Sequence, residues 1–294
     1  MRMIALLLGV VLIWGMNWPL MKIAMSDISP LWFGTFRMAI GAVGLLIFLI
    51  MRGQFRWPTM KDKNHIVILG LLQMGAYISL VNVGLHYNSV GHSAILVYST
   101  PIWIIPVAVL FFKEKFPYLK KLGFIFSILG ILVLFNPLSF DWSNQSALIG
   151  SGLLLLAAVV WTIGVLFTKY SHWPSSVLEL LPWQLLVGAF FIFIASLIFE
   201  PAPVIEWSAS LVTLLVYEGI IVTAFSFWAI IELNKQLSAI TSSLAMLAVP
   251  LIGMVSSAIY LGEEITAGLL SAYLLLTAGI VCGIVADQKV RLKS

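Results

Sequence analysis

Long runs of apolar residues, separated by short polar breaks, constrain the fold of this chain more than any other feature of its sequence. A run of about 20 apolar residues is the length that an α-helix needs to cross the hydrocarbon core of a bilayer. The first run includes IALLLGVVLIWG at residues 4–15, which lacks the alternation of apolar and polar residues expected of a transmembrane β-strand. Backbone groups in lipid must then be hydrogen-bonded within each segment, so the sequence predicts an all-α integral membrane protein.

The composition agrees with this class. Of the 294 residues, 61% are hydrophobic and only 10% are charged, whereas a soluble domain is nearer to half apolar and a quarter charged. The breaks are too short to hold a second, soluble domain. We predict ten transmembrane helices, at residues 4–24, 31–51, 65–87, 89–112, 118–138, 146–168, 177–199, 209–234, 238–261 and 266–286.

The first apolar run follows Arg2, as in a cleaved signal peptide. The run does not end in the small-x-small motif of a signal-peptide cleavage site. It continues instead into Trp14, Asn17, Trp18 and Pro19. We therefore expect the segment to be retained as the first span.

Basic residues are distributed unequally between the two sides that ten spans create. Fourteen of the sixteen Lys and Arg residues fall on the side that carries both termini, Lys22 alone falls on the other, and Arg37 lies within the second span. The positive-inside rule places that basic side, and both termini, in the cytoplasm of a cell whose inner (plasma) membrane holds the protein. A basic rim facing anionic lipid accounts for the charge, so no nucleic-acid partner is expected.

Two stretches of the chain carry the same pattern, 149 residues apart. STPIWIIPVAVLFFKEK (Ser99–Lys115) and AVPLIGMVSSAIYLGEE (Ala248–Glu264) each place Glu thirteen residues after Pro, as Pro101 to Glu114 and Pro250 to Glu263. The same shift aligns further identical residues: Gly15 with Gly164, Gly70 with Gly219, Ser89 with Ser238, Ser93 with Ser242, and Gly130 with Gly279. We interpret the chain as two repeats, residues 1–145 and 146–294.

Each repeat has five spans. Because five is odd, the second repeat enters the membrane from the opposite face, which predicts two inverted five-helix halves. Inverted repeats are a transporter architecture, in which one sequence in two orientations has two packings of similar energy. The arrangement predicts alternating access to a central site.

The chain resembles the EamA-type proteins of the drug/metabolite transporter superfamily. The matching features are IWGMNW (Ile13–Trp18), Arg37 and the two Pro-to-Glu stretches ending in FFKEK and YLGEE, although Phe112-Lys113 stands where the family has Gly before the first Glu. The resemblance implies secondary transport of amino acids, metabolites or other small molecules, by export or exchange. The aromatic amino-acid exporters are a similar group, given the eleven Trp residues of this chain.

Polar and aromatic residues at mid-membrane depth are the candidate substrate contacts. Apolar walls with a few polar groups are typical of small-molecule cavities, although each residue alone could equally serve packing or interface anchoring. The candidates come from spans one, three, four, six and eight: Trp14, Asn17, Gln73, Tyr77, Tyr98, Trp161, Thr223, Ser226 and Trp228.

Three ionisable residues within the spans are candidates for charge balance and coupling. Arg37 needs a partner, since a central Arg costs about 2.5–3.5 kcal/mol on the insertion scale. Glu218 and His92 are the candidate partners, and Glu218 is the candidate proton carrier. The pair could instead be purely structural, and the sequence leaves this alternative open. Pro101 and Pro250 are expected to kink spans four and nine, either as hinges or as fixed geometry.

Other functions fit less well. A multidrug exporter of lipophilic cations is the alternative within transport, but span one lacks the deep carboxylate that such a mechanism uses. A membrane enzyme would need clustered catalytic groups or metal ligands, and the four His residues are scattered while Cys282 is the only cysteine. A channel would need a filter or charged ring, and none is visible. No cofactor, metal or ATP-binding loop is expected. The oligomeric state is left open, and one copy suffices for the fold.

Overall fold

The computed structural model describes residues 2–135, 143–203, 205, 207–262 and 267–291. Within these residues every regular element is a helix, which confirms the prediction of an all-α protein. In the described part of the chain, eight helical segments are long and apolar enough to cross a membrane: Met3–Ala24, Pro30–Met51, Met60–Tyr87, Val90–Leu110, Gln145–Tyr170, Val177–Phe199, Ala209–Gln236 and Ala239–Leu261.

Helices begin at the residues that local chemistry favours. Helix α2 (Pro30–Met51) has Pro at its start, where a missing N–H is tolerated. Helix α9 (Val177–Phe199) begins with a capping box in which Ser176 and Glu179 bond to each other's backbone amides. Helix α8 (Gln145–Tyr170) is capped by the side chain of Asn144, whose oxygen accepts from the amide of Ala147.

Two of the predicted spans contain a π-helical turn in their middle. The third runs through η1 (Met60–Asp62), α3 (Lys63–Leu69), η2 (Gly70–Ala76) and α4 (Tyr77–Tyr87). The eighth runs through α10 (Ala209–Tyr217), η3 (Glu218–Phe225) and α11 (Ser226–Gln236). Both η2 and η3 are π-helical, and such turns occur frequently at functional sites. Apolar periodicity alone could not predict them.

The predicted spans four and nine are each divided into two helices. Helices α5 (Val90–Val97) and α6 (Thr100–Leu110) meet at Tyr98 and Ser99, and α12 (Ala239–Met246) meets α13 (Ala248–Leu261) at Leu247. Each break comes just before a proline, Pro101 in span four and Pro250 in span nine. A proline lacks the N–H of a helical hydrogen bond, and its ring clashes with the carbonyl four residues earlier.

Helices α7 (Tyr118–Phe135) and α14 (Ala267–Arg291) pack closely against each other. A Cβ atom on Gly123 would lie 2.7 Å from the carbonyl oxygen of Gly279, so the two backbones nearly touch. Residues 136–138 and 266 of the predicted spans lie outside the described residues, and so does Glu263.

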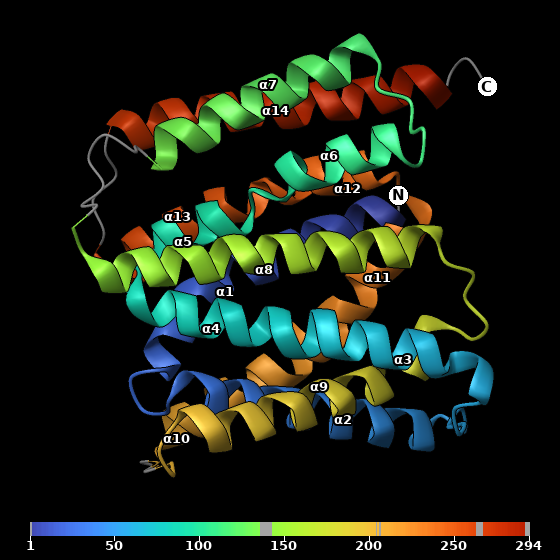
Figure 1. Ribbon diagram of the computed structural model, residues 1–294, viewed down its shortest axis with the longest axis vertical. Coiled ribbons are helices and arrows are strands. Elements are labelled where there is room, and N and C mark those ends of the chain that lie inside the picture. Colours follow the sequence, from blue (N-terminus) through green and yellow to red (C-terminus); the bar gives the residue numbers. More distant parts are fainter. Residues whose placement is uncertain (1, 136–142, 204, 206, 263–266, 292–294) are drawn as a thin grey trace.

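The helices stack in levels, and most levels hold helices from before residue 136 beside helices from after residue 144 (Figure 1). From top to bottom in Figure 1, with α1 spanning Arg2–Ala24, the levels are α7 with α14, α5–α6 with α12–α13, α1 with α8, α3–α4, and α2 with α9. The segment from α10 to α11 crosses the lower levels obliquely.

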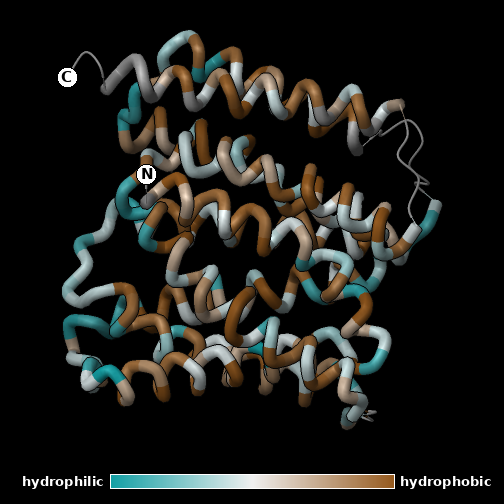
Figure 2. The backbone as a smooth tube through the Cα atoms, turned by 180° about the vertical axis from the view of Figure 1, so that it is seen from behind, coloured by the Kyte–Doolittle hydropathy of each residue, from teal (hydrophilic) through white to brown (hydrophobic). Residues whose placement is uncertain are grey.

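Helix α1 begins and α14 ends at the same edge of the molecule, the right-hand edge of Figure 1. The connections at residues 52–59, 111–117 and 171–176 lie at that edge too, and we call it the basic end because most Lys and Arg residues lie there. The opposite end carries residues 25–29 and 88–89. Figure 2 shows hydrophilic residues concentrated at these two ends and hydrophobic residues between them.

Candidate functional site

A buried ion pair lies at the centre of the molecule. Arg37 of α2 and Glu218 of η3 are 3% and 0% exposed, and the Arg37 guanidinium lies 3.3 Å from Oε2 of Glu218. Arg37 Nε also donates to the hydroxyl of Thr223 at 3.1 Å, and the amide of Asn17 on α1 donates to Glu218 Oε2 at 3.4 Å. Three separate helical segments therefore converge on one carboxylate.

Small residues allow the two charged side chains to meet. A Cβ atom on Gly41 of α2 would lie 2.8 Å from the carbonyl oxygen of Gly219, and one on Gly219 would lie 2.7 Å from Cβ of Ile40. Any larger side chain at either position would push α2 and η3 apart. The close approach at Gly41 and Gly219 therefore brings the guanidinium within reach of its partner.

Aromatic rings and Arg37 line the same cavity. The rings of Trp14 and Trp161 have centroids 5.6 Å apart, Trp14 packs on Phe227 at 5.7 Å, and Tyr77 packs on Trp161 at 4.7 Å. The indole of Trp14 also donates to the carbonyl of Val222 at 3.3 Å. These side chains lie beside a central cavity of about 40 Å³, which is lined by Trp14, Asn17, Trp18, Met21, Arg37, Tyr77, Ile78, Val81, Tyr98, Val222 and Phe227.

Two buried acceptors beside the ion pair lack a hydrogen-bond donor among the described residues. They are Oδ1 of Asn17 and Oε1 of Glu218. A buried polar group without a partner costs about 1–3 kcal/mol, so such groups call for an explanation. Because both atoms are acceptors, the ligand that suits them is a hydrogen-bond donor, such as an ammonium group.

The structure brings most of the predicted site residues together. Trp14, Asn17, Arg37, Tyr77 and Tyr98 line the central cavity. Trp161, Thr223 and Glu218 contact these lining residues. Gln73 lies one helical turn from Tyr77, and its buried side-chain amide has no hydrogen-bond partner among the described residues.

The other predicted site residues lie apart from the cavity. The hydroxyl of Ser226 donates to the carbonyl of Ile221 at 2.9 Å, within the π-helical region. Trp228 lines a separate apolar pocket with Gly44 and Phe48. The His92 ring contacts the hydroxyl of Ser151 at 3.1 Å, rather than approaching Arg37.

Sequence reasoning missed two aromatic members of the cavity wall, Trp18 and Phe227. Trp18 is one helical turn after Trp14 and one residue after Asn17, so helical spacing alone could have indicated it. The Trp18 ring lies 6.2 Å from that of Tyr98. Phe227 offered no such signal, because an apolar residue in an apolar helix is ordinary.

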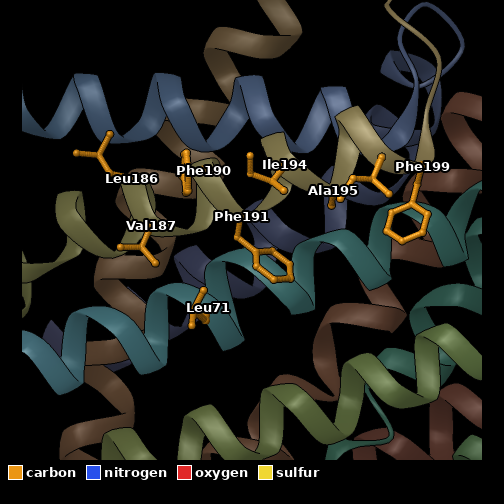
Figure 3. A pocket seen from close by; sticks show the side chains of 9 residues that line it. Leu71, Leu186, Val187, Phe190, Phe191, Ile194, Ala195 and Phe199 are labelled. Carbon is orange, nitrogen blue, oxygen red and sulfur yellow. The ribbon is translucent and has the colours of Figure 1, made fainter.

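A larger groove on α9 lacks the chemistry of a polar-substrate site. Figure 3 shows its walls, which come from α9 and from Leu71 of η2. Its volume is about 630 Å³, and every side chain that lines it is hydrocarbon. No group in it can orient a polar substrate. Among the described residues no three His, Cys, Asp or Glu side chains are grouped to hold a metal ion.

Comparison with known proteins identifies the family. The sequence profile of the EamA-like transporter family matches residues 1–136 and again residues 148–284. The chain belongs to the EamA-like transporter family. It is therefore a small-molecule transporter of the drug/metabolite transporter superfamily and a multi-pass membrane protein, rather than an enzyme.

Relatives of this EamA-like protein cover nearly its whole length. It is 31% identical over 282 residues to the "Uncharacterized transporter YoaV" of Bacillus subtilis, covering 95% of this chain and 96% of the relative. It is 25% identical over 287 residues to a "Probable amino-acid metabolite efflux pump" of Salmonella typhimurium, covering 94% and 92% of the two chains. A solved crystal structure shares the fold with a TM-score of 0.77 at 16% identity, over 96% of this chain and 98% of that one.

Proposed function

We propose that this EamA-like protein is a secondary transporter that moves a zwitterionic amino acid, with an aromatic or large apolar side chain, by alternating access. Export or exchange across the inner membrane is the direction we propose. The observation that carries the proposal is the buried Arg37–Glu218 pair inside an aromatic wall, with one oxygen of Glu218 lacking a donor.

The balance of charge at the cavity favours a zwitterion. Arg37 supplies a cation for a carboxylate, while Glu218 and Asn17 supply acceptors for an ammonium group. Trp14, Trp161 and the neighbouring rings offer a face for an apolar or aromatic side chain. A lipophilic cation would meet the buried guanidinium as a like charge, which disfavours a multidrug exporter.

The protein must change conformation before a substrate can enter the central cavity. The cavity of about 40 Å³ admits a few water molecules but is too small for an amino acid. We propose that the two halves, residues 1–145 and 146–294, form ten spans as two inverted five-helix repeats and move against each other around this cavity. The matched π-helical turns, the matched breaks before Pro101 and Pro250 and the paired levels of Figure 1 support this division.

The orientation follows from charge. We propose that the basic end faces the cytoplasm, together with both termini, since Lys and Arg concentrate there. The one basic residue assigned to the opposite side, Lys22, donates to the carbonyl of Leu85 at 2.8 Å and so satisfies a helix end. Glu218 is the residue we propose to exchange a proton during transport.

Ligand binding to the purified protein tests the amino-acid proposal. L-Phenylalanine is expected to raise the unfolding temperature, whereas phenethylamine and phenylpropionate each lack one charged group and are expected to raise it less. Stabilisation by tetraphenylphosphonium without any by amino acids would favour the lipophilic-cation alternative and overturn the proposal.

Transport then tests the mechanism. In liposomes that contain the protein and unlabelled phenylalanine, labelled phenylalanine is expected to accumulate transiently by counterflow and to saturate with concentration. Flux that grows without saturation would contradict alternating access and indicate a channel.

A further inference from the structure

Four buried polar side chains between the central cavity and the basic end carry atoms that have no hydrogen-bond partner among the described residues. They are Nδ1 of His65, both amide atoms of Gln73, Oγ1 of Thr168 and Oε1 of Gln184. His65 is 6% exposed and the others are 0–1% exposed. Since the large majority of buried side-chain polar atoms are normally paired, five unpaired atoms in one region call for a partner there.

Three of these side chains, His65, Gln73 and Thr168, follow the interface between η2–α3 and α8 toward the basic end. At the cavity, Tyr77 packs on Trp161. One turn further, a Cβ atom on Gly164 would lie 2.6 Å from Nε2 of Gln73. Thr168 is the next residue along that face of α8, four residues after Gly164.

The polar side chains reach the basic end at His65. Its Nε2 lies 3.0 Å from the hydroxyl of Ser171, which is partly exposed at the end of α8. Helix α9 contributes Gln184, whose Nε2 donates to the carbonyl of His65 at 3.2 Å while Oε1 stays unpaired. The η2–α3 segment, α8 and α9 therefore all contribute polar atoms to one line of side chains between Tyr77 and Ser171, which we call the polar strip.

An aromatic cover separates this strip from solvent. Trp173 packs on the His65 ring at 4.8 Å, and its indole donates to the carbonyl of Thr168 at 3.0 Å. Lys235 of α11 lies 4.8 Å from the centroid of the Trp173 ring. The charged and titratable groups near His65 are thus Asp62 of η1, Lys235 of α11 and His172 of the α8–α9 connection.

Water is the partner that suits these atoms. The set includes donors and acceptors, and it offers no carboxylate or thiolate that would select a metal ion. Left dry, each unpaired group would cost about 1–3 kcal/mol. Ordered water in proteins typically makes about three hydrogen bonds to groups of this kind.

We propose that His65, Gln73, Thr168 and Gln184 line a buried file of water molecules that carries protons between the basic end and the Arg37–Glu218 pair. The proton role of the file rests on the proposed function, while its hydration does not. A proton taken up at one ring nitrogen of His65 is released from the other to the file, and the last water passes one proton to the Glu218 carboxylate. No bond between heavy atoms changes, and the same steps in reverse return the proton.

Radiolytic hydroxyl-radical footprinting of the unmodified protein tests the hydration. Leu69 lies between His65 and Gln73 in sequence, and Leu154 is the matched control; both are 0% exposed. Oxidation of Leu69 is expected to exceed that of Leu154, and Thr168→Val with Gln184→Leu is expected to remove the excess. Equal oxidation of the two leucines in the unmodified protein would overturn the file.

Thr162→Val is the control substitution. The Thr162 hydroxyl already donates to the carbonyl of Ala158 at 2.8 Å, on the same helix as Thr168. It is expected to leave the oxidation of Leu69 unchanged.

Proton movement in liposomes tests the conduction. With a trapped pH dye, phenylalanine-driven proton flux is expected to fall at least about tenfold in His65→Gln and Thr168→Val. Phenylalanine homoexchange is expected to stay near the unmodified rate in both variants. Unchanged proton flux in these two variants would overturn conduction through the file. Conduction would also be overturned if a phenylalanine gradient drove no proton flux in unmodified protein that exchanges phenylalanine. If the unmodified protein did not exchange phenylalanine at all, the proposed function would be contradicted instead. The footprinting result would still decide whether the file is hydrated.

Discussion

The carboxylate of Glu114 accepts a hydrogen bond of 2.9 Å from the backbone amide of Ala239, at the start of α12. The hydroxyl of Tyr170 donates to the same oxygen at 2.6 Å, and the amide of Ile240 approaches the second oxygen at 3.4 Å. A residue from before residue 136 therefore caps a helix from after residue 144. Because the N-terminus of a helix favours negative charge, we expect this contact to hold the two segments together at the basic end.

Glu114→Ala is expected to loosen the basic end. Loss of a helix cap costs about 0.5–2 kcal/mol, so the unfolding temperature should fall. A cysteine placed at Ala239, in a background without Cys282, should also react faster with a maleimide. The neighbouring exposed substitution Lys115→Ala is the control and should change neither quantity. Unchanged labelling in Glu114→Ala would contradict a closing role for this contact.

Removal of one member of the central ion pair is expected to destabilise the protein more than removal of both. Arg37→Met leaves the Glu218 carboxylate buried without its countercharge, at a cost of about 3–5 kcal/mol. The double variant Arg37→Met with Glu218→Met should recover much of that stability and still fail to bind phenylalanine. Thermal unfolding of the two single variants and the double variant, each compared with the unmodified protein, gives the coupling energy.

An exposed ion pair provides the control for this cycle. Arg56 and Glu179 lie 3.8 Å apart, and the Arg56 side chain is 79% exposed. Their coupling is expected to be at most about 1 kcal/mol. A similar coupling for both pairs would contradict the buried electrostatic interaction at Arg37.

Gly41→Ala is expected to be destabilising and to weaken binding, because its Cβ atom would press on the backbone of Gly219. Gly152→Ala in α8 is the matched control, since a Cβ atom there would meet nothing within 4 Å. In the control, the better helix propensity of Ala is worth about 1 kcal/mol and should leave stability equal or higher. If both substitutions changed the unfolding temperature in the same direction, the close approach of α2 and η3 would be refuted.

Substitution of two tryptophans tests whether phenylalanine binds at the central cavity or at the separate apolar pocket. Trp161→Ala removes a ring that packs on both Trp14 and Tyr77. An aromatic residue at the centre of a site can contribute about 2 kcal/mol or more, so the phenylalanine affinity should fall about thirtyfold. Trp228→Ala, at the separate apolar pocket, should leave the affinity nearly unchanged. A larger loss at Trp228 than at Trp161 would place the binding site elsewhere.

The sequence predicted the helical class and a candidate partner of Arg37 because both follow from the cost of polar groups in an apolar medium. The same cost made Glu218 stand out in its span. The sequence could not predict the π-helical segments η2 and η3. Each packs against a helix distant in the sequence, η2 against α9 and η3 against α2 around Gly41 and Gly219. Nor could it separate Trp228 from Trp161. Both are tryptophans within apolar spans, and only tertiary contacts decide which ring faces the cavity.

Cysteine labelling from the two sides of the membrane tests the inverted arrangement. Gly53 and Ala202 are equivalent under the 149-residue shift, and both are exposed. Gly53 follows α2 and Ala202 follows α9, and these two helices finish at opposite ends of the molecule (Figure 1). In a Cys282→Ser background, Ala202→Cys should react with an impermeant maleimide in intact cells, whereas Gln54→Cys, beside Gly53, should react only in inside-out vesicles. His172→Cys, at the basic end of the second half, is the control for orientation and should behave as Gln54→Cys does. If Gln54→Cys and Ala202→Cys reacted from the same side, the two halves could not be inverted.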